Sequence, residues 1–170
     1  RSTNLTLQGT RETNSIVWIA GQLKVDNGNN VWSCSQTLTQ GVSRLTYYAV
    51  DRAGNLSTNQ EIWFLADTVA PAVTAVAPIN GTTTNSSPPV VLVTYLEASS
   101  GLDLSRCTRT ISKGGVVIPG EWAVSTNTLT FTPAGTLLDG TYAVSVQLID
   151  RLANTGSVFS STFSVDTIAP

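Results

Sequence analysis

Histidine and methionine are both missing from the 170 residues, and only 12% of the side chains are charged. Without histidine the chain has no usual general base, no Ser-His or Cys-His dyad and no histidine-containing metal site. The spacing of Glu12, Glu61, Glu97 and Glu121 indicates no carboxylate pair of the kind that glycoside hydrolysis requires. We therefore expect no catalytic residues and a protein that is not an enzyme.

Positive charge is also scarce. The chain has Lys+Arg 9 against Asp+Glu 11, which gives a net charge of −2, and the basic residues are scattered. This pattern provides no surface that would gather phosphates or anionic lipids, so we expect no nucleic-acid partner. The longest apolar runs, such as Val90–Val93, are far too short to span a bilayer, and we expect no membrane insertion in this segment.

The sequence is rich instead in short stretches where apolar and polar residues alternate. In the clearest one, Tyr142, Val144, Val146 and Leu148 point one way and the residues between them the other, which is typical of a half-buried strand. Similar stretches recur between residues 5 and 64 and again after Val73, separated by turn-forming residues. Many short strands with this spacing predict an all-β sandwich or barrel.

An internal repeat divides these strands into two sets. Tyr48–Asn55 (YAVDRAGN) is echoed by Val146–Asn154 (VQLIDRLAN), and both copies are strands that run into an Asp-Arg turn. Each copy continues through another strand to a similar exit, Ala66–Pro71 (ADTVAP) and Val165–Pro170 (VDTIAP). Because proline cannot donate to a sheet and holds the preceding residue extended, this exit is suited to a connector between domains.

The repeat predicts the domain boundaries. We expect one sandwich over residues 1–68, a second over 69–165, and a connector over 166–170 that leads to a following domain of the same polypeptide. The only two cysteines, Cys34 and Cys107, then lie in different domains, so neither domain has an internal disulfide. We expect both to be buried thiols on strands.

These motifs resemble the bacterial immunoglobulin-like (Big-type) repeats of large secreted or surface proteins, in which a strand ends in Asp-x-Ala-Gly-Asn and the domain ends in Val-Asp-Thr-x-Ala-Pro. Asp51–Asn55 matches the turn fully, whereas Asp150–Asn154 has alanine where the first copy has glycine, so a different turn geometry is expected there. The resemblance implies two tandem immunoglobulin-like antiparallel β-sandwiches in an extracellular or cell-surface protein. Its motifs are specific for fold and carry no activity with them.

The first domain is also similar to compact accessory sandwiches, through Leu7–Thr10 and Trp18–Gly21. Compared with such domains it lacks an opening strand before Thr3. Either that strand lies upstream, or another segment fills the groove, which raises the hypothesis of self-association by strand donation between copies.

Four aspartates in the repeated turns and exits are the candidate metal ligands: Asp51, Asp67, Asp150 and Asp166. Related surface arrays hold calcium at such turns, because calcium prefers carboxylate and carbonyl oxygens. The competing interpretation is that each aspartate accepts hydrogen bonds from its own turn and needs no metal. No other cofactor is expected.

Tryptophan supplies the second candidate site, because a flat aromatic face can pack against a sugar ring. Trp18 and Trp32 lie on alternating strands where an inward, core position is natural. Trp63, between Ile62 and Phe64, is the best candidate for an exposed, carbohydrate-binding ring.

Two functions follow from these observations. The first is a non-catalytic structural or adhesive segment of an extracellular or cell-surface repeat protein or fibre, with neighbouring domains as partners. The alternative is an accessory carbohydrate-binding domain pair of a secreted polysaccharide-active enzyme, with a surface glycan as ligand. Exposed tryptophans in a row would favour the carbohydrate-binding function.

Overall fold

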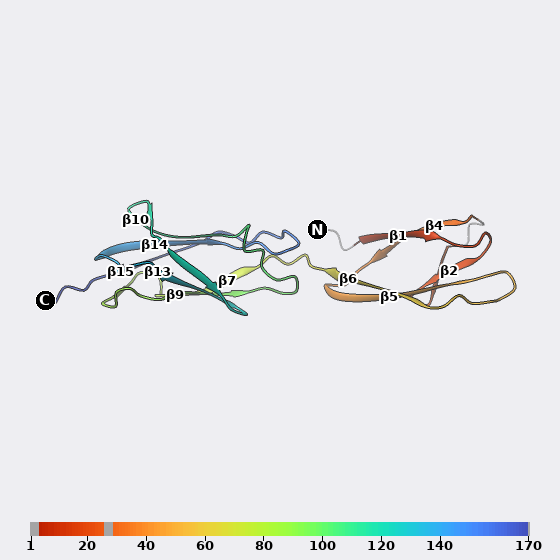
Figure 1. Cartoon of the computed structure of the whole chain (residues 1–170), viewed down its shortest axis with the longest axis horizontal. Helices are drawn as coiled ribbons and strands as arrows, with labels where there is room; N and C mark the ends of the chain where they lie inside the picture. The colour runs from red at the N-terminus through yellow and green to blue at the C-terminus, as the bar shows by residue number, and fades with distance from the viewer. Residues whose placement is uncertain (1–3, 26–28, 170) are drawn as a thin grey trace. The chain divides into compact units, whose positions relative to one another are not determined.

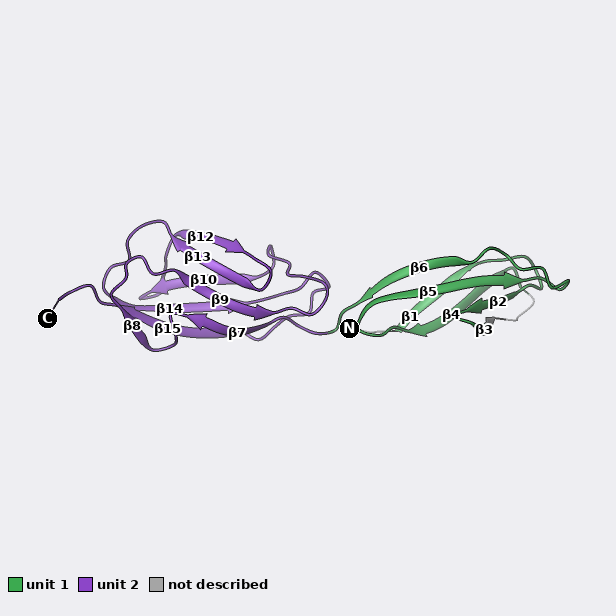
Figure 2. Ribbon diagram, turned by 90° about the horizontal axis from the view of Figure 1, so that it is seen from below, with its two compact units in different colours: residues 1–68 green, residues 69–170 purple. Residues whose placement is uncertain are grey.

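The chain is all-β and forms two compact units. The computed structural model describes residues 4–25 and 29–169, and Pro170, the last residue of the expected connector, lies outside them. Unit 1 comprises residues 1–68 and unit 2 residues 69–170 (Figure 2). The described ranges contain strands, turns and loops, and no helix in them could cross a membrane (Figure 1).

Unit 2 is a sandwich of two sheets with strand orders β12-β13-β9-β7 and β11-β10-β14-β15-β8. Neighbouring strands are antiparallel, except that β8 runs parallel to β15. The bounds are β7 Ala72–Ala77, β8 Thr82–Thr84, β9 Val91–Leu96, β10 Thr108–Lys113, β11 Val116–Val117, β12 Gly120–Val124, β13 Thr128–Pro133, β14 Gly140–Gln147 and β15 Phe159–Val165.

The core of unit 2 follows directly from the alternation in its sequence. On β14, Tyr142, Val144 and Val146 are buried and the residues between them face outward. The inward residues of β9 and β13 meet them across the sandwich, and with those of β15 in the same sheet they form one continuous buried cluster. Burial of this apolar surface is the main stabilising contribution to the unit.

Unit 1 has fewer strands. It consists of a two-stranded sheet, β1-β4, and a four-stranded sheet, β3-β2-β5-β6. The bounds are β1 Asn4–Thr10, β2 Ile16–Ile19, β3 Gln22–Val25, β4 Val31–Thr37, β5 Gly41–Val50 and β6 Gln60–Ala66. Among its described residues, Leu7, Val17, Ile19 and Trp32 form the buried cluster, with further apolar residues half-buried around them.

The two units share one strand plan. Residues 41–71 align with 140–170 without a gap, so β5 corresponds to β14 and β6 to β15, and Gly41 pairs with Ala66 as Gly140 pairs with Val165. The order β3-β2-β5-β6 then matches β11-β10-β14-β15, and β1-β4 matches β9-β13. Within the described ranges of unit 1, nothing corresponds to β7, β8 or β12.

This plan, with two antiparallel sheets and the final strand beside the preceding one, is that of an immunoglobulin-like β-sandwich, as the sequence predicts. Unit 2 is the fuller version of it. The described part of unit 1 has no counterpart of the strands β7, β8 and β12, which cover strand edges in unit 2.

Candidate functional site

The outward side of the four-stranded sheet in unit 1 carries an unusual set of apolar and aromatic residues. Its exposed members include Val42, Trp63 and Leu65, whose exposed fractions are 69%, 62% and 40%. We call the following residues the outer aromatic face: Trp18, Val42, Arg44, Tyr48, Trp63 and Leu65.

The register of the strands brings these side chains together. Trp18 on β2 pairs with Tyr48 on β5, and the two rings are stacked with centroids 6.3 Å apart and planes 3° apart. Arg44, on the same side of β5, pairs with Trp63 on β6. Arg44 and Tyr48 are four positions apart on β5, a distance of about 13 Å along the strand. The face therefore has two aromatic positions, the stacked Trp18 and Tyr48 rings and the Trp63 ring.

Arg44 contacts both Trp63 and Glu61. Its guanidinium carbon lies 5.8 Å from the centroid of the Trp63 ring, and its Nη1 lies 3.3 Å from Oε1 of Glu61. A cation over an indole ring is weakly attractive at an exposed site. The face therefore combines a flat aromatic surface with hydrogen-bond donors and acceptors. A sugar ring has an apolar side and hydroxyl groups, which match these two kinds of group.

The corresponding side of unit 2 differs in chemistry. At the positions that match Val42, Trp63 and Leu65, β14 and β15 carry Thr141, Thr162 and Ser164. Small polar residues are what a sheet face in water ordinarily presents. The apolar character of the face is thus a property of unit 1 and not of the shared fold.

This arrangement corrects the interpretation of Trp18. The sequence suggested that Trp18 points inward, but Val17 and Ile19 are the buried residues of β2 and Trp18 lies on the opposite side. Trp32 is buried, as expected, and Trp63 is exposed, as expected. Trp122 in unit 2 is half-buried against Phe131.

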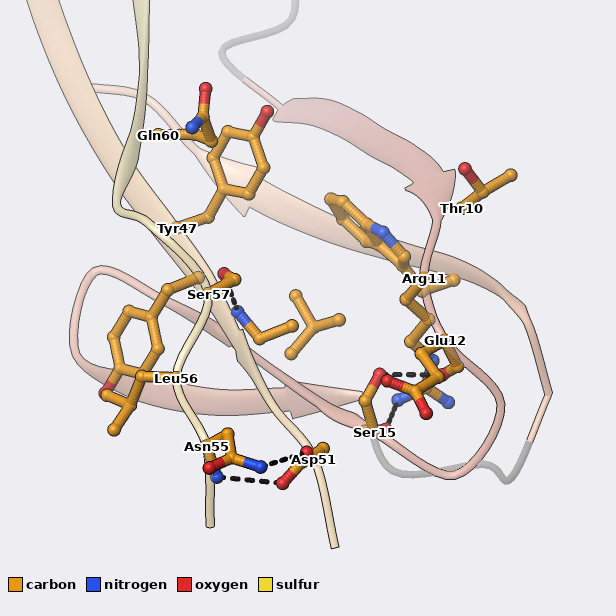
Figure 3. A pocket seen from close by; sticks show the side chains of 14 residues that line it. Thr10, Arg11, Glu12, Ser15, Tyr47, Asp51, Asn55, Leu56, Ser57 and Gln60 are labelled. Atoms are coloured by element: carbon orange, nitrogen blue, oxygen red, sulfur yellow. Dashed lines mark hydrogen bonds between the residues drawn. The ribbon is translucent and has the colours of Figure 1, made fainter. Parts of the chain in front are cut away.

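A pocket opens between the two sheets at one end of unit 1 (Figure 3). Its volume is about 400 Å³, and Trp32, Tyr47 and Leu56 contribute apolar wall. In Figure 3, Arg11 and Glu12 lie across the pocket from Tyr47 and Leu56, and there Ser15 Oγ donates to the Glu12 carbonyl at 2.7 Å and the Arg11 side chain donates to the Ser15 carbonyl.

Asp51 and Asn55, which belong to one turn, also line this pocket and lie at the bottom of the view in Figure 3. The backbone N–H of Asn55 donates to Oδ1 of Asp51 at 2.8 Å, and its side-chain amide donates to Oδ2 at 2.7 Å. These bonds, chiefly the one from the Asn55 side chain, hold the pKa of Asp51 below its usual value.

The second copy of the turn is nearly identical. Asn154 donates to Oδ1 and Oδ2 of Asp150 at 2.8 and 2.6 Å, and Ala153 has a positive φ of 62° where Gly54 has 87°. The expectation that alanine changes this turn is therefore wrong. The two turns differ in burial, because Asp150 is fully buried and Asp51 is partly exposed.

The remaining candidate aspartates lie at the ends of the last strands. Asp67 Oδ1 accepts from Gln40 Nε2 at 2.7 Å, and Asp166 Oδ1 accepts from the Ile168 N–H at 3.1 Å. Since β5 and β6 are antiparallel, Asp51 and Asp67 lie at opposite ends of unit 1, and Asp150 and Asp166 lie likewise in unit 2. Within a unit the two predicted ligands do not meet.

The structure brings a different carboxylate to Asp150. Carboxylate oxygens of Glu97 and Asp150 lie within 4.8 Å of one another. Glu97 Oε1 accepts three backbone N–H groups, from Ser99, Ser100 and Gly101 at 3.1, 2.9 and 2.9 Å, while its Oε2 is buried without a partner among the described residues. The oxygens of two carboxylates are fewer than the six to eight oxygen ligands that calcium takes.

The cysteines are unpaired and half-buried, Cys34 in unit 1 and Cys107 in unit 2. Cys34 lies on β4, whereas Cys107 comes just before β10 rather than on a strand. The Sγ of Cys107 accepts from the Ile149 N–H at 3.2 Å, which gives this thiol a structural role.

Comparisons with known proteins identify no family for this chain. No protein-family model matches the chain, and no curated protein matches it. Among solved structures, the chain is similar to PcoC, a methionine-rich copper resistance protein from Escherichia coli, at 15% identity and a TM-score of 0.49, over 58% of this chain and 100% of that one.

Longer but looser matches are to tandem modules. A chimeric titin Z1Z2 matches at 13% identity and a TM-score of 0.42, over 96% of this chain and 88% of that one. The fibronectin(III)-like modules of Clostridium thermocellum CbhA match at 15% identity and a TM-score of 0.35, over 97% and 86%. The strand order itself places both units in the immunoglobulin-like β-sandwich fold.

Proposed function

We propose that the chain is a non-catalytic adhesive segment of an extracellular or cell-surface repeat protein of the Big type, in which unit 2 is a structural spacer and unit 1 binds glycan. The observation that carries this proposal is the outer aromatic face. Trp18, Tyr48 and Trp63 lie on the same side of one sheet, the first two half-buried and Trp63 exposed, and a spacer has no need of such a face.

Physical chemistry supports a glycan as the ligand. The apolar side of a pyranose packs on an indole or phenol ring, and Arg44 and Glu61 lie beside Trp63 to meet sugar hydroxyls. The face is open, which suits a chain-like ligand that leaves at both ends. The repeated strand plan and exits support the structural half of the proposal.

The test is binding of the whole chain to a panel of insoluble and soluble polysaccharides, by pull-down and by calorimetric titration. We expect Trp63→Ala to weaken binding on the order of tenfold, as loss of a central aromatic anchor does. Trp122→Phe in unit 2 is the matched control and should leave binding unchanged.

Two outcomes would count against the proposal. Failure of the folded chain to bind any polysaccharide would remove the adhesive role and leave a spacer. Release of new reducing ends from a bound polysaccharide would contradict the non-catalytic role.

A further inference from the structure

Among the strand edges of unit 1 that have no neighbour in the described residues are the edge of β1 away from β4 and the edge of β6 away from β5. In unit 2 the matching edges are both covered, because β7 pairs with β9 and β8 pairs with β15. Unit 2 therefore shows how the same two edges are paired when a strand covers each of them.

The free edge of β1 presents unused backbone groups. The N–H of Arg11 donates to the Asn30 carbonyl, so by the alternation of an antiparallel ladder Leu5, Leu7 and Gly9 also point their backbone groups at β4. The N–H and C=O groups of Thr6, Gln8 and Thr10 then point at the free edge. The strand has neither the charge nor the proline with which exposed edges are usually protected.

The interior behind these edges is incompletely covered. In unit 2, Val144, Val146 and Phe163 are 1%, 0% and 1% exposed, whereas their counterparts Leu45, Tyr47 and Phe64 in unit 1 are only half-buried. The pocket of about 400 Å³ opens from the same interior. Gln36 on β4 also has a buried Nε2 with no acceptor among the described residues.

Unit 2 shows the chemistry that covers such an interior. β7 is uncharged, Val73 and Val76 pack against the core, and alanines occupy much of the rest of the strand. β8 adds three threonines on the edge of β15. Residues 72–84 thus close both edges with a few apolar side chains and backbone hydrogen bonds.

We propose that unit 1 accepts an added strand of this type: an extended, uncharged segment with two valine-sized side chains on one face, paired antiparallel with β1 and supplied by a polypeptide segment outside residues 1–170. The proposal concerns the strand edges and is independent of the glycan-binding face. Strand addition of this kind draws its affinity from main-chain hydrogen bonds and its specificity from alternate side chains.

A second copy of this chain is a poorer occupant. The β7 and β8 strands of a second copy are already engaged in their own unit. Donation between copies would need one of these units to open first.

One position sets where the added strand starts. In unit 2, a Cβ at Gly156 would lie 2.2 Å from the Pro71 carbonyl oxygen, so glycine is required for Pro71 to lie there. Unit 1 has Ser57 at the matching position, and its Oγ accepts from the Ala49 N–H at 2.9 Å. The added strand therefore begins after the residue that corresponds to Pro71.

The test uses the whole chain and a fluorescent peptide with the sequence of residues 72–84. We expect saturable binding by anisotropy and a rise in the unfolding midpoint of unit 1, because a ligand of the folded state stabilises it. Gln8→Pro removes a free-edge donor without removing a bond to β4 and should weaken binding about tenfold, whereas Gln8→Thr should not.

A peptide with Val73→Asp and Val76→Asp tests the apolar contact without altering the protein, and it should not bind. Equal binding by wild type and Gln8→Pro would place the peptide elsewhere and overturn the proposal. So would the absence of any stabilisation when the same segment is fused ahead of Thr3. Dimers of the chain alone in light scattering would show that a second copy takes the edge and would also overturn it.

Discussion

Ala153 holds a left-handed backbone conformation that alanine rarely adopts. Its φ is 62°, and the Asp150–Asn154 turn imposes that angle through the same bonds that hold Gly54 at 87° in unit 1. In this region a residue with a Cβ destabilises the folded state by roughly 1–2 kcal/mol. Glycine avoids this strain, but its greater conformational freedom in the unfolded chain cancels part of the gain.

We therefore expect Ala153→Gly to stabilise unit 2 by about 0.5–1 kcal/mol, which raises its unfolding midpoint by about 3–5 °C. The reciprocal change, Gly54→Ala, should lower the midpoint of unit 1. Differential scanning calorimetry measures both, and a lower midpoint for Ala153→Gly would contradict the strain at this position.

Glu97 and Asp150 form the acidic pair that the sequence did not predict. Calcium ligation by Asp51, Asp67, Asp150 and Asp166 stays a prediction, and the pair gives it a sharper test. A buried carboxylate oxygen without a partner is unfavourable unless a cation or proton neutralises it.

If calcium binds at this pair, millimolar calcium should raise the unfolding midpoint of unit 2, and Glu97→Gln should abolish the rise. Glu121→Gln, an exposed change in the same unit, is the control. Calorimetry with calcium and then with excess chelator gives the answer. An unchanged midpoint would leave the competing interpretation, that the aspartates only close their own turns.

Residue-level inference from the sequence succeeded where the alternation was clean and failed where it was not. Val144 and Val146 were assigned inward because polar residues separate them. Trp18 was assigned wrongly because Ile16–Ile19 is apolar throughout, and such a run does not say which side is buried. Glu97 was missed as a neighbour of Asp150 because long-range contacts leave no local pattern.

Among the elements, β7 depends on a single glycine outside it. The close approach of Pro71 to Gly156 lets the chain enter β7 against the turn that precedes β15. Any side chain at residue 156 has to displace the backbone of Pro71, and backbone yields less readily than a flexible side chain.

We expect Gly156→Ala to destabilise unit 2 by about 1–3 kcal/mol and to increase hydrogen exchange in Ala72–Ala77 first. Gly135→Ala is the matched control, because a Cβ there meets nothing within 4 Å. Equal stability of the two variants would mean that β7 is held independently of this contact.

Most of the longer strands were predictable from the sequence, whereas β8 and β12 were not. β8 is three threonines and β12 is short and largely exposed, so neither shows the alternation of a half-buried strand. Such strands exist because neighbours offer them hydrogen bonds. Neither has a counterpart in the described part of unit 1, and the expected lack of an opening strand concerned β7 alone.

For the whole molecule, the two units are expected to unfold separately. Counted over the residues that the structure describes, the buried cluster has four members in unit 1 and thirteen in unit 2, so unit 1 buries much less apolar surface there. We expect two calorimetric transitions, with unit 1 unfolding at the lower temperature.

Tryptophan fluorescence assigns these transitions, because Trp18, Trp32 and Trp63 lie in unit 1 and only Trp122 lies in unit 2. The larger change in emission should accompany the first transition. A single cooperative transition seen by both methods would contradict independent units.

The parallel pairing of β8 with β15 has a mechanical consequence. When unit 2 is pulled by its two ends, the bonds between Thr82–Thr84 and Phe163–Val165 are loaded together in shear, whereas bonds at a strand end are peeled one after another. In the described part of unit 1, the first and last strands, β1 and β6, are not paired with each other. Under tension we therefore expect unit 1 to unfold first. In single-molecule stretching it should unfold at the lower force and lengthen the chain while unit 2 stays folded.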